Sequence, residues 1–250
     1  MAITIKSARE IELMRESCKR LSEVHQAMEE MIKPGITTWE IDEFAENMIR
    51  KMGCTPNFKN YYGYPASVCC SVNDEVVHGI PSKTRVLKDG DIISLDAGLI
   101  YKGYHSDAAR THAVGNVDKE VLKLMEVTKQ SFFEGIKYAL AGHYLHEISN
   151  AIDAYVSQYG YGIVYDLIGH GIGRELHESP EIPNFRQTTR GPKLRPGMTL
   201  AIEPMINMGR AEVVLLDDEW TFVTEDGSMS AHYENTILIT DGEPEILTLY

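Results

Sequence analysis

The stretch Asp89-Gly-Asp-Ile-Ile-Ser-Leu-Asp96 has a counterpart later in the chain, Pro196-Gly-Met-Thr-Leu-Ala-Ile-Glu203. In both stretches a turn glycine precedes an apolar strand, and a carboxylate stands six residues after the glycine. Such an echo is weak by itself, because a turn glycine followed by a strand recurs in many folds. However, an unpaired carboxylate in a buried strand is very costly. Both acids are therefore candidates for functional residues.

The chain on either side of these stretches predicts one compact α/β domain over residues 1–250. Capping boxes at Ser7 with Glu10 and at Thr37 with Glu40 begin two helices, which stop near Pro34 and Gly53. Helical periodicity predicts two further helices, over about 118–140 and 146–159. The β-rich stretches, bounded by Gly, Pro and Asp, are 67–80, 91–114, 161–170, 197–207, 212–224 and 230–249.

Composition limits the classes of protein to consider. A chain of 250 residues can bury a sizeable core without disulfides, and its four cysteines show no C-x-x-C pair. The net charge of −13 argues against a surface that binds nucleic acid, since Lys and Arg supply most of that affinity. No run of ~18 apolar residues predicts a membrane span, and no signal peptide precedes the first helix. We therefore expect a cytoplasmic protein without membrane or DNA contacts.

Asp96 lies in an apolar strand, and the strand that returns after the turn near Lys102 carries Asp107. If the numbers of paired residues add to 203 or to 205, the two acids lie opposite or diagonal on one sheet face. Two carboxylates that close repel each other, so that one is protonated or a cation lies between them. The alternatives are an ion pair with Arg110 or a role in capping the turn.

Three further residues raise the same question. Glu203 interrupts an apolar strand, where an ion pair with Arg195 or Arg210 is the alternative to a metal. Glu234 follows a strand pattern and could face solvent. His170 stands in a glycine-rich segment that is not a dinucleotide fingerprint, and a lone histidine there is more often only hydrogen-bonded.

Together these five residues and the phrases around them resemble the type I methionine aminopeptidases, which have the creatinase/aminopeptidase or pita-bread fold. The resemblance covers nearly the whole chain, through Ser71-Val-Asn-Asp-Glu-Val-Val-His78-Gly-Ile-Pro81, Asp96 with His105-Ser-Asp107, Gly169-His-Gly-Ile-Gly-Arg-Glu-Leu-His177-Glu-Ser-Pro180, Pro196 to Pro204, and Ser230-Ala-His-Tyr-Glu234-Asn. It implies curved antiparallel sheets in two pseudo-twofold halves, covered by helices. The two matching stretches, which end in Asp96 and Glu203, would then supply one carboxylate from each half of the fold.

The resemblance also implies roles. Asp107 and Glu234 would bridge two divalent ions, Asp96 would chelate one ion, and His170 with Glu203 would hold the other. Such ligands suit Mn, Fe, Co or Zn without selecting among them. Two ions that share a water can deliver hydroxide to the scissile carbonyl at neutral pH. Glu203 would shuttle the proton, His177 would stabilise the oxyanion, and His78 would hydrogen-bond the substrate.

The implied reaction is removal of the initiator methionine from nascent polypeptides, with a preference for a small second residue. Methionine requires an apolar slot, and ordinary packing is the alternative for each wall residue. The candidate walls are Phe58, Tyr61, Tyr64, Cys69, Leu176 and Trp220. Phe58 and Leu176 depart from some relatives, which leaves the size of the slot open. We expect a monomer that contacts the ribosome at most transiently.

Rival interpretations have less support. X-Pro aminopeptidases and prolidases share the five ligands but usually carry a large extra N-terminal domain, and creatinases lack the metal set. Type II methionine aminopeptidases insert a helical segment before the glutamate, for which the 25 residues between His177 and Glu203 leave no room. A non-catalytic relative would have lost ligands. His143 and His146 have metal-like spacing but no third ligand nearby, and no cysteine or serine motif predicts a nucleophile.

Overall fold

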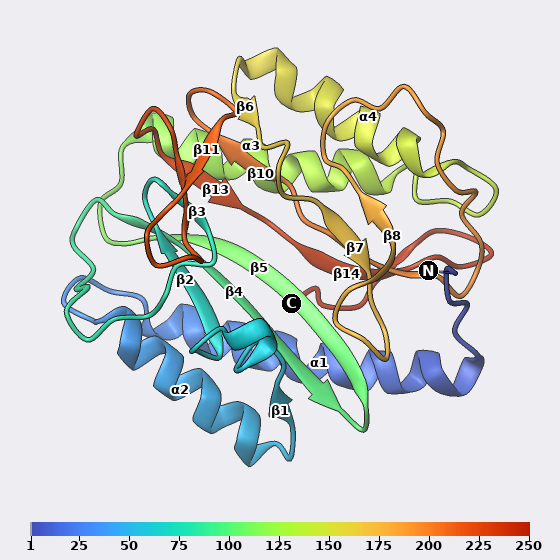
Figure 1. The fold of residues 1–250 in the computed structure, drawn as a ribbon, viewed down its shortest axis with the longest axis horizontal. Coiled ribbons are helices and arrows are strands. Elements are labelled where there is room, and N and C mark those ends of the chain that lie inside the picture. The colour runs from blue at the N-terminus through green and yellow to red at the C-terminus, as the bar shows by residue number, and fades with distance from the viewer. Residues whose placement is uncertain (1) are drawn as a thin grey trace.

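A computed structural model describes residues 2–250, which form four α-helices, two short 3-10 helices and fifteen strands (Figure 1). The helices are α1 (Ala8–Met31), α2 (Thr38–Lys51), η1 (Tyr61–Gly63), α3 (Lys119–Ile136), α4 (Leu145–Val156) and η2 (Ser157–Tyr159). The strands of the first half are β1 (Thr55–Pro56), β2 (Val68–Val72), β3 (Glu75–Val77), β4 (Ile92–Tyr101) and β5 (Tyr104–Ala113). Those that follow are β6 (Gly162–Ile163), β7 (Gly169–Gly171), β8 (Glu178–Ile182), β9 (Thr199–Ile202), β10 (Met205–Asn207), β11 (Val213–Leu215), β12 (Phe222–Thr224), β13 (Ser230–His232), β14 (Asn235–Leu238) and β15 (Glu245–Ile246).

The first half packs α1 and α2 on a sheet in the order β1-β4-β2, with β5 also paired to β4 (Figure 1). Both predicted capping boxes are present, with Glu10 Oε2 accepting from the Ser7 amide at 2.9 Å and Glu40 Oε2 from the Thr37 amide at 2.8 Å. Apolar side chains of both helices and of β2 and β4 form one core beneath this sheet.

The second half packs α3 and α4 over strands that include the five-stranded sheet β15-β14-β9-β7-β8. A separate apolar core joins these helices to β9, β10 and β14. All pairings between strands are antiparallel, which confirms the predicted mixed α/β class with antiparallel sheets. None of the helices in residues 2–250 combines the length and apolar character that a bilayer crossing requires.

The two halves meet where β5 lies beside β14. Thr236 joins the strands, since its hydroxyl accepts from the Asp107 amide at 3.2 Å and donates to the Asp107 carbonyl at 2.9 Å. The Glu234 amide donates to the Ala109 carbonyl at 2.9 Å. Asp107 from the first half and Glu234 from the second are therefore held side by side at the centre of the molecule.

The turn glycines of the two matching stretches, Gly90 and Gly197, have the same role in both halves. Gly90 has φ +95° and Gly197 has φ +88°, a backbone conformation that glycine adopts without steric cost. Each turn begins the strand, β4 or β9, that leads to the acid. The structure also has elements that the sequence analysis did not predict, namely β1, β8 and η1.

Candidate metal and active site

One cavity of about 260 Å³ collects every residue that the sequence predicted for the site. Its lining consists of Phe58, Tyr61, Tyr62, Tyr64, Cys69, His78, Asp96, Asp107, His170, Leu176, His177, Glu203, Trp220 and Glu234. Only Tyr62 in this set was not predicted. Side chains from both halves of the fold thus face the same space, with the acids at one part of the lining and aromatic and aliphatic groups at another.

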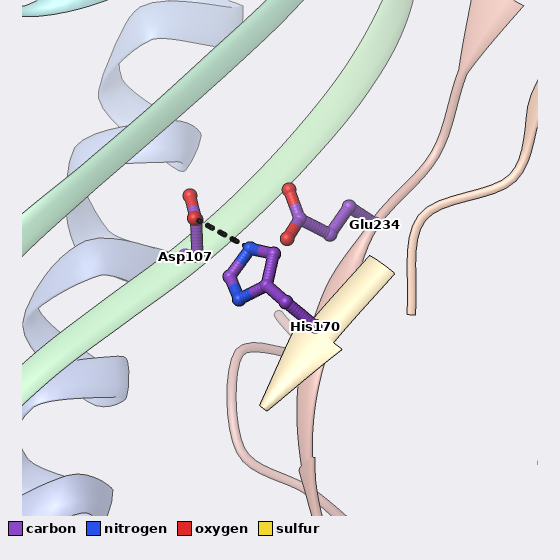
Figure 2. A group of neighbouring side chains, drawn as sticks. All are labelled: Asp107, His170 and Glu234. Carbon is purple, nitrogen blue, oxygen red and sulfur yellow. Dashed lines mark ion pairs between the residues drawn. The ribbon is translucent and has the colours of Figure 1, made fainter. Parts of the chain in front are cut away.

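Asp107, His170 and Glu234 form the tightest group in this cavity (Figure 2). Each offers one donor atom, and these atoms all lie within 4.8 Å of one another. All three residues are buried, and His170 Nε2 lies 3.7 Å from Asp107 Oδ2. The group is assembled from β5, β7 and the residue just before β14, which are distant in sequence.

The strand register of the β4–β5 hairpin places Asp96 beside this group. Asp96 pairs with Ala109, and Asp107 pairs with Gly98, so that the two acids are diagonal neighbours on one sheet face. The numbers of paired residues add to 205, one of the two registers that the sequence analysis considered. The turn residues Lys102 and Gly103 both have positive φ, as a two-residue hairpin turn of this type requires.

Glu203 and His170 face each other across neighbouring strands. Glu203 follows β9, its backbone carbonyl accepts from Asn184 Nδ2 at 3.1 Å, and its Oε1 lies 3.7 Å from His170 Nε2. The Nδ1 of His170 lies 2.8 Å from the Gly171 carbonyl. A carbonyl can only accept, so Nδ1 carries the proton and Nε2 presents a lone pair to the acids.

Burial and mutual repulsion dominate the electrostatics of the four acids, and Arg110 offsets them in part at Glu234. Burial raises the pKa of Asp96 to about 7. Burial, followed by the charges of nearby acids, also raises the pKa of Asp107, Glu203 and Glu234 well above the usual range. The pKa of His170 is lowered to about 3 by burial and then by His177, which keeps the imidazole neutral.

The structure contradicts the ion-pair alternatives to metal binding and the solvent-facing alternative for Glu234. Arg110 donates to the carbonyls of Ala109, Glu234 and Thr248 and to Asn235 Oδ1, and not to either aspartate. Arg210 pairs with Glu225 at 3.0 Å instead of Glu203. Glu234 is 2% exposed and does not face solvent. Within residues 2–250, no lysine or arginine pairs with any of the four acids.

The four acids and His170 fit a divalent cation site. Asp96 Oδ1, Asp107 Oδ1 and Glu234 Oε1 are buried and lack a hydrogen-bond partner among the described residues. Buried carboxylate oxygens are normally hydrogen-bonded, paired or metal-bound. Oxygen donors with one neutral imidazole match the preferences of Mn, Fe, Co and Zn, without distinguishing them.

His177 stands beside this group, with its ring 4.3 Å from that of His170 between centroids. Its Nδ1 lies 2.9 Å from the Tyr61 hydroxyl. Burial lowers the pKa of His177, and burial raises the pKa of Tyr61, so both groups are neutral near pH 7. His78, whose φ is +59°, lines the same cavity, and burial lowers its pKa to about 4.

The apolar part of the cavity is built from buried side chains. Phe58, Cys69 and Leu176 are buried. Tyr64 packs edge-on against Trp220 at 5.2 Å between ring centroids, and its hydroxyl donates to a backbone carbonyl. Such walls suit an unbranched, polarisable side chain.

Other candidates from the sequence do not form sites. His143, which lies just before α4, has its Nδ1 2.8 Å from the Glu147 carboxylate in the first turn of that helix, and both side chains are partly exposed. All four cysteines are free and buried, and burial raises the pKa of Cys54, Cys69 and Cys70, which disfavours the nucleophilic thiolate.

Sequence reasoning missed two residues near the site. Tyr62 is 86% exposed at the cavity and has φ +48°. Its signal was the run of three tyrosines around Gly63. His232 lies behind Glu203, with its Nε2 3.7 Å from Glu203 Oε2. Its signal in the sequence was its place two residues before Glu234, at the end of the predicted strand, which the structure ends at His232.

Comparison with known proteins identifies the family of the chain. The profile of metallopeptidase family M24 matches residues 12–241. A methionine aminopeptidase of Clostridium acetobutylicum is 53% identical over 99% of both chains. The structure of methionine aminopeptidase from Thermotoga maritima superposes with a TM-score of 0.97 at 43% identity, over 100% of both chains.

The prolidase of Pyrococcus furiosus also superposes, with a TM-score of 0.79 at 25% identity, but the match covers only 65% of that chain. These neighbours confirm the predicted pita-bread fold. Full-length agreement and higher identity place the chain with the aminopeptidases instead of the prolidases. The chain therefore belongs to metallopeptidase family M24 and, within it, to the methionine aminopeptidases.

Proposed function

We propose that the protein removes the initiator methionine from nascent polypeptides by metal-dependent hydrolysis, and that it prefers a small second residue. One observation carries the proposal. Five metal-binding side chains and an apolar slot line the same cavity of about 260 Å³. A volume of this size accommodates a methionine side chain.

We infer that two divalent cations bind here, with Asp107 and Glu234 shared between them. Asp96 would complete the ligand set of one ion, and His170 with Glu203 would complete that of the other. The close approach of Asp107, His170 and Glu234 supports this assignment, as do the buried oxygens without partners. When bound, such ions supply Lewis acidity that lowers the pKa of water and polarises a carbonyl.

Three side chains carry out proton transfer, oxyanion stabilisation and substrate binding. Glu203, whose carboxylate lies 3.7 Å from both His170 Nε2 and His232 Nε2, accepts the proton from the attacking water and passes it to the leaving amine. With Tyr61 hydrogen-bonded to its Nδ1, His177 donates from Nε2 to the developing oxyanion. His78 hydrogen-bonds the substrate from the same cavity wall.

The apolar walls orient the first residue. Phe58, Tyr61, Tyr64, Cys69, Leu176 and Trp220 exclude water around its side chain. We further propose that the protein acts as a cytoplasmic monomer. The net charge of −13 favours at most a transient contact with the ribosome, since RNA is also negatively charged.

Hydrolysis of Met-Ala-Ser by metal-stripped protein, titrated with Mn, Fe or Co, tests the proposal against Met-Lys-Ser and Ala-Pro-Ser. We expect metal-restored cleavage of Met-Ala-Ser alone, lost in Asp96→Ala and Glu203→Ala but kept in the surface control His143→Ala. Cleavage of Ala-Pro-Ser would keep the metal site and overturn the substrate. Metal binding without any cleavage would favour a non-catalytic binding protein.

A further inference from the structure

The carboxylate of Glu203 lies between two imidazoles. Its Oε1 is 3.7 Å from His170 Nε2, and its Oε2 is 3.7 Å from His232 Nε2. His170 belongs to the proposed metal site, whereas His232 does not line the cavity. His232 instead lines a second cavity, together with Arg110, Thr111 and Tyr233.

The surroundings of His232 leave its ring little freedom. It is the last residue of β13, pairs with Met205 of β10 and is 1% exposed. Its backbone is held on both sides by Thr111, whose hydroxyl accepts from the His232 amide at 2.8 Å and donates to the His232 carbonyl at 2.9 Å. The backbone position of His232 is therefore set by β5 and β10.

Neither ring nitrogen of His232 has a hydrogen-bond partner among residues 2–250. A buried polar group left unpaired destabilises the fold, so a buried imidazole without a partner calls for an explanation. A neutral imidazole has one N–H donor. Glu203 Oε2 faces Nε2 and is an acceptor that needs a donor when the acid is ionised.

We propose that His232 is a positioning residue for Glu203: its Nε2–H donates to Oε2 and thereby turns Oε1 toward His170. A movement of less than about 1 Å brings the two atoms to the 2.7–2.9 Å of a charge-assisted hydrogen bond. This inference rests on the proposed role of Glu203 as metal ligand and proton carrier. His232 itself touches neither substrate nor ion.

The orientation of a carboxylate matters more than its presence at such a site. Groups that hold metal ligands in place commonly contribute about 10- to 100-fold to metal affinity or activity. Loss of the His232 hydrogen bond should lower kcat and metal affinity together, while KM for a peptide held by the distant apolar walls changes little.

Three substitutions separate hydrogen bonding from packing. His232→Gln can place an amide N–H where Nε2 lies, whereas His232→Asn is too short and His232→Leu has no donor. The readouts are kcat and KM on Met-Ala-Ser, Mn²⁺ affinity of the metal-stripped protein by calorimetry, the visible absorption of the Co²⁺ form, and the melting temperature. His143→Gln is the matched surface control.

We expect the Gln variant to stay within about threefold of the unmodified protein, and the Asn and Leu variants to lose about 10- to 100-fold in kcat and Mn²⁺ affinity. Their Co²⁺ spectra should change and their KM should stay within about twofold. Unchanged kcat and Mn²⁺ affinity in His232→Leu would overturn the proposal. So would equal losses in all three variants that follow their melting temperatures, since these indicate packing alone.

The experiment also separates this inference from the proposed function. If the unmodified protein binds Mn²⁺ but cleaves no peptide, the proposed function fails. The Mn²⁺ affinities and Co²⁺ spectra of the three variants still decide the role of His232 in that case.

Discussion

Asp96 and Asp107 lie diagonally across the β4–β5 hairpin, because Asp96 pairs with Ala109 and Asp107 pairs with Gly98. Both side chains are directed into the same cavity, and each has a buried oxygen without a hydrogen-bond partner among the described residues. The hairpin register thus places two like charges together in a poorly solvated space. Folding the metal-free protein costs free energy at this point, and a cation would recover it.

Metal binding should release protons. Burial raises the pKa of Asp96 to about 7 and raises the pKa of the three neighbouring acids, so the metal-free site holds protons near pH 6.5. Cations bind the deprotonated acids, and affinity for Mn²⁺ should therefore fall as the pH drops below about 7. Calorimetry at pH 6.5 in buffers of different ionisation enthalpy measures the protons released.

The direction in which pH changes the stability of the metal-free protein follows from the same raised pKa values. A raised folded-state pKa favours the protonated acid, so ionisation of the metal-free site destabilises the fold increasingly as the pH rises through about 7. Metal should consequently raise the melting temperature more at pH 8 than at pH 6. A rise in melting temperature on metal binding that is no larger at pH 8 than at pH 6 would contradict this prediction, and a binding enthalpy that is the same in all buffers would contradict the release of protons.

Asp107→Asn should stabilise the metal-free protein while it destroys metal binding. The substitution removes a buried charge next to Asp96 and Glu234 and adds an N–H donor for their oxygens. A relief of about 1 kcal/mol or more raises the melting temperature of a chain this long by about 2–4 °C. Scanning calorimetry with and without Mn²⁺ tests this, with exposed Asp166→Asn as control. A lower melting temperature in the metal-free variant would show that Asp107 has other stabilising contacts.

Tyr61→Phe should lower kcat more than it raises KM. The phenol hydroxyl lies 2.9 Å from His177 Nδ1, and when it donates there the proton of His177 is on Nε2, where it can reach an oxyanion. Loss of one such hydrogen bond costs about 0.5–1.5 kcal/mol, or about three- to tenfold in kcat. Steady-state hydrolysis of Met-Ala-Ser measures the effect, with exposed Tyr138→Phe as control. A rise in KM alone would assign Tyr61 to the apolar slot only.

Lys6→Met should destabilise the loop that carries His177. Lys6 Nζ lies 2.6 Å from Glu178 Oε2, both side chains are largely buried, and Glu178 also accepts from the Arg174 amide at 2.8 Å. Removing one partner of a buried ion pair costs about 3–5 kcal/mol, because the other charge stays buried. Denaturant unfolding of Lys6→Met, Glu178→Gln and the double variant measures this, and the double variant should lose less than the two single losses combined. Strict additivity would mean that the pair is not coupled.

Local features of the fold were predictable from the sequence because short-range interactions decide them. The capping boxes at Ser7 and Thr37 and the turn glycines Gly90 and Gly197 act within a few residues, and all four lie where the local pattern predicted. The strand β8 was missed because Glu178–Ile182 lacks the apolar alternation of a strand and is held by pairing with β7. The short η1 was likewise missed, and its residues Tyr62 and Gly63 both have positive φ.

The sequence by itself determined which chemical groups the protein can use: four acids in apolar strands, histidines near glycines, and the motifs of a known family. Their assignment as metal ligands stays a proposal, although they line one cavity. Only the tertiary structure decided that Asp107 and Glu234 meet at the β5–β14 seam, that Tyr61 contacts His177, and that His232 faces Glu203. These contacts join residues far apart in the chain, and their geometry depends on strand register and packing, which no local pattern of residues specifies.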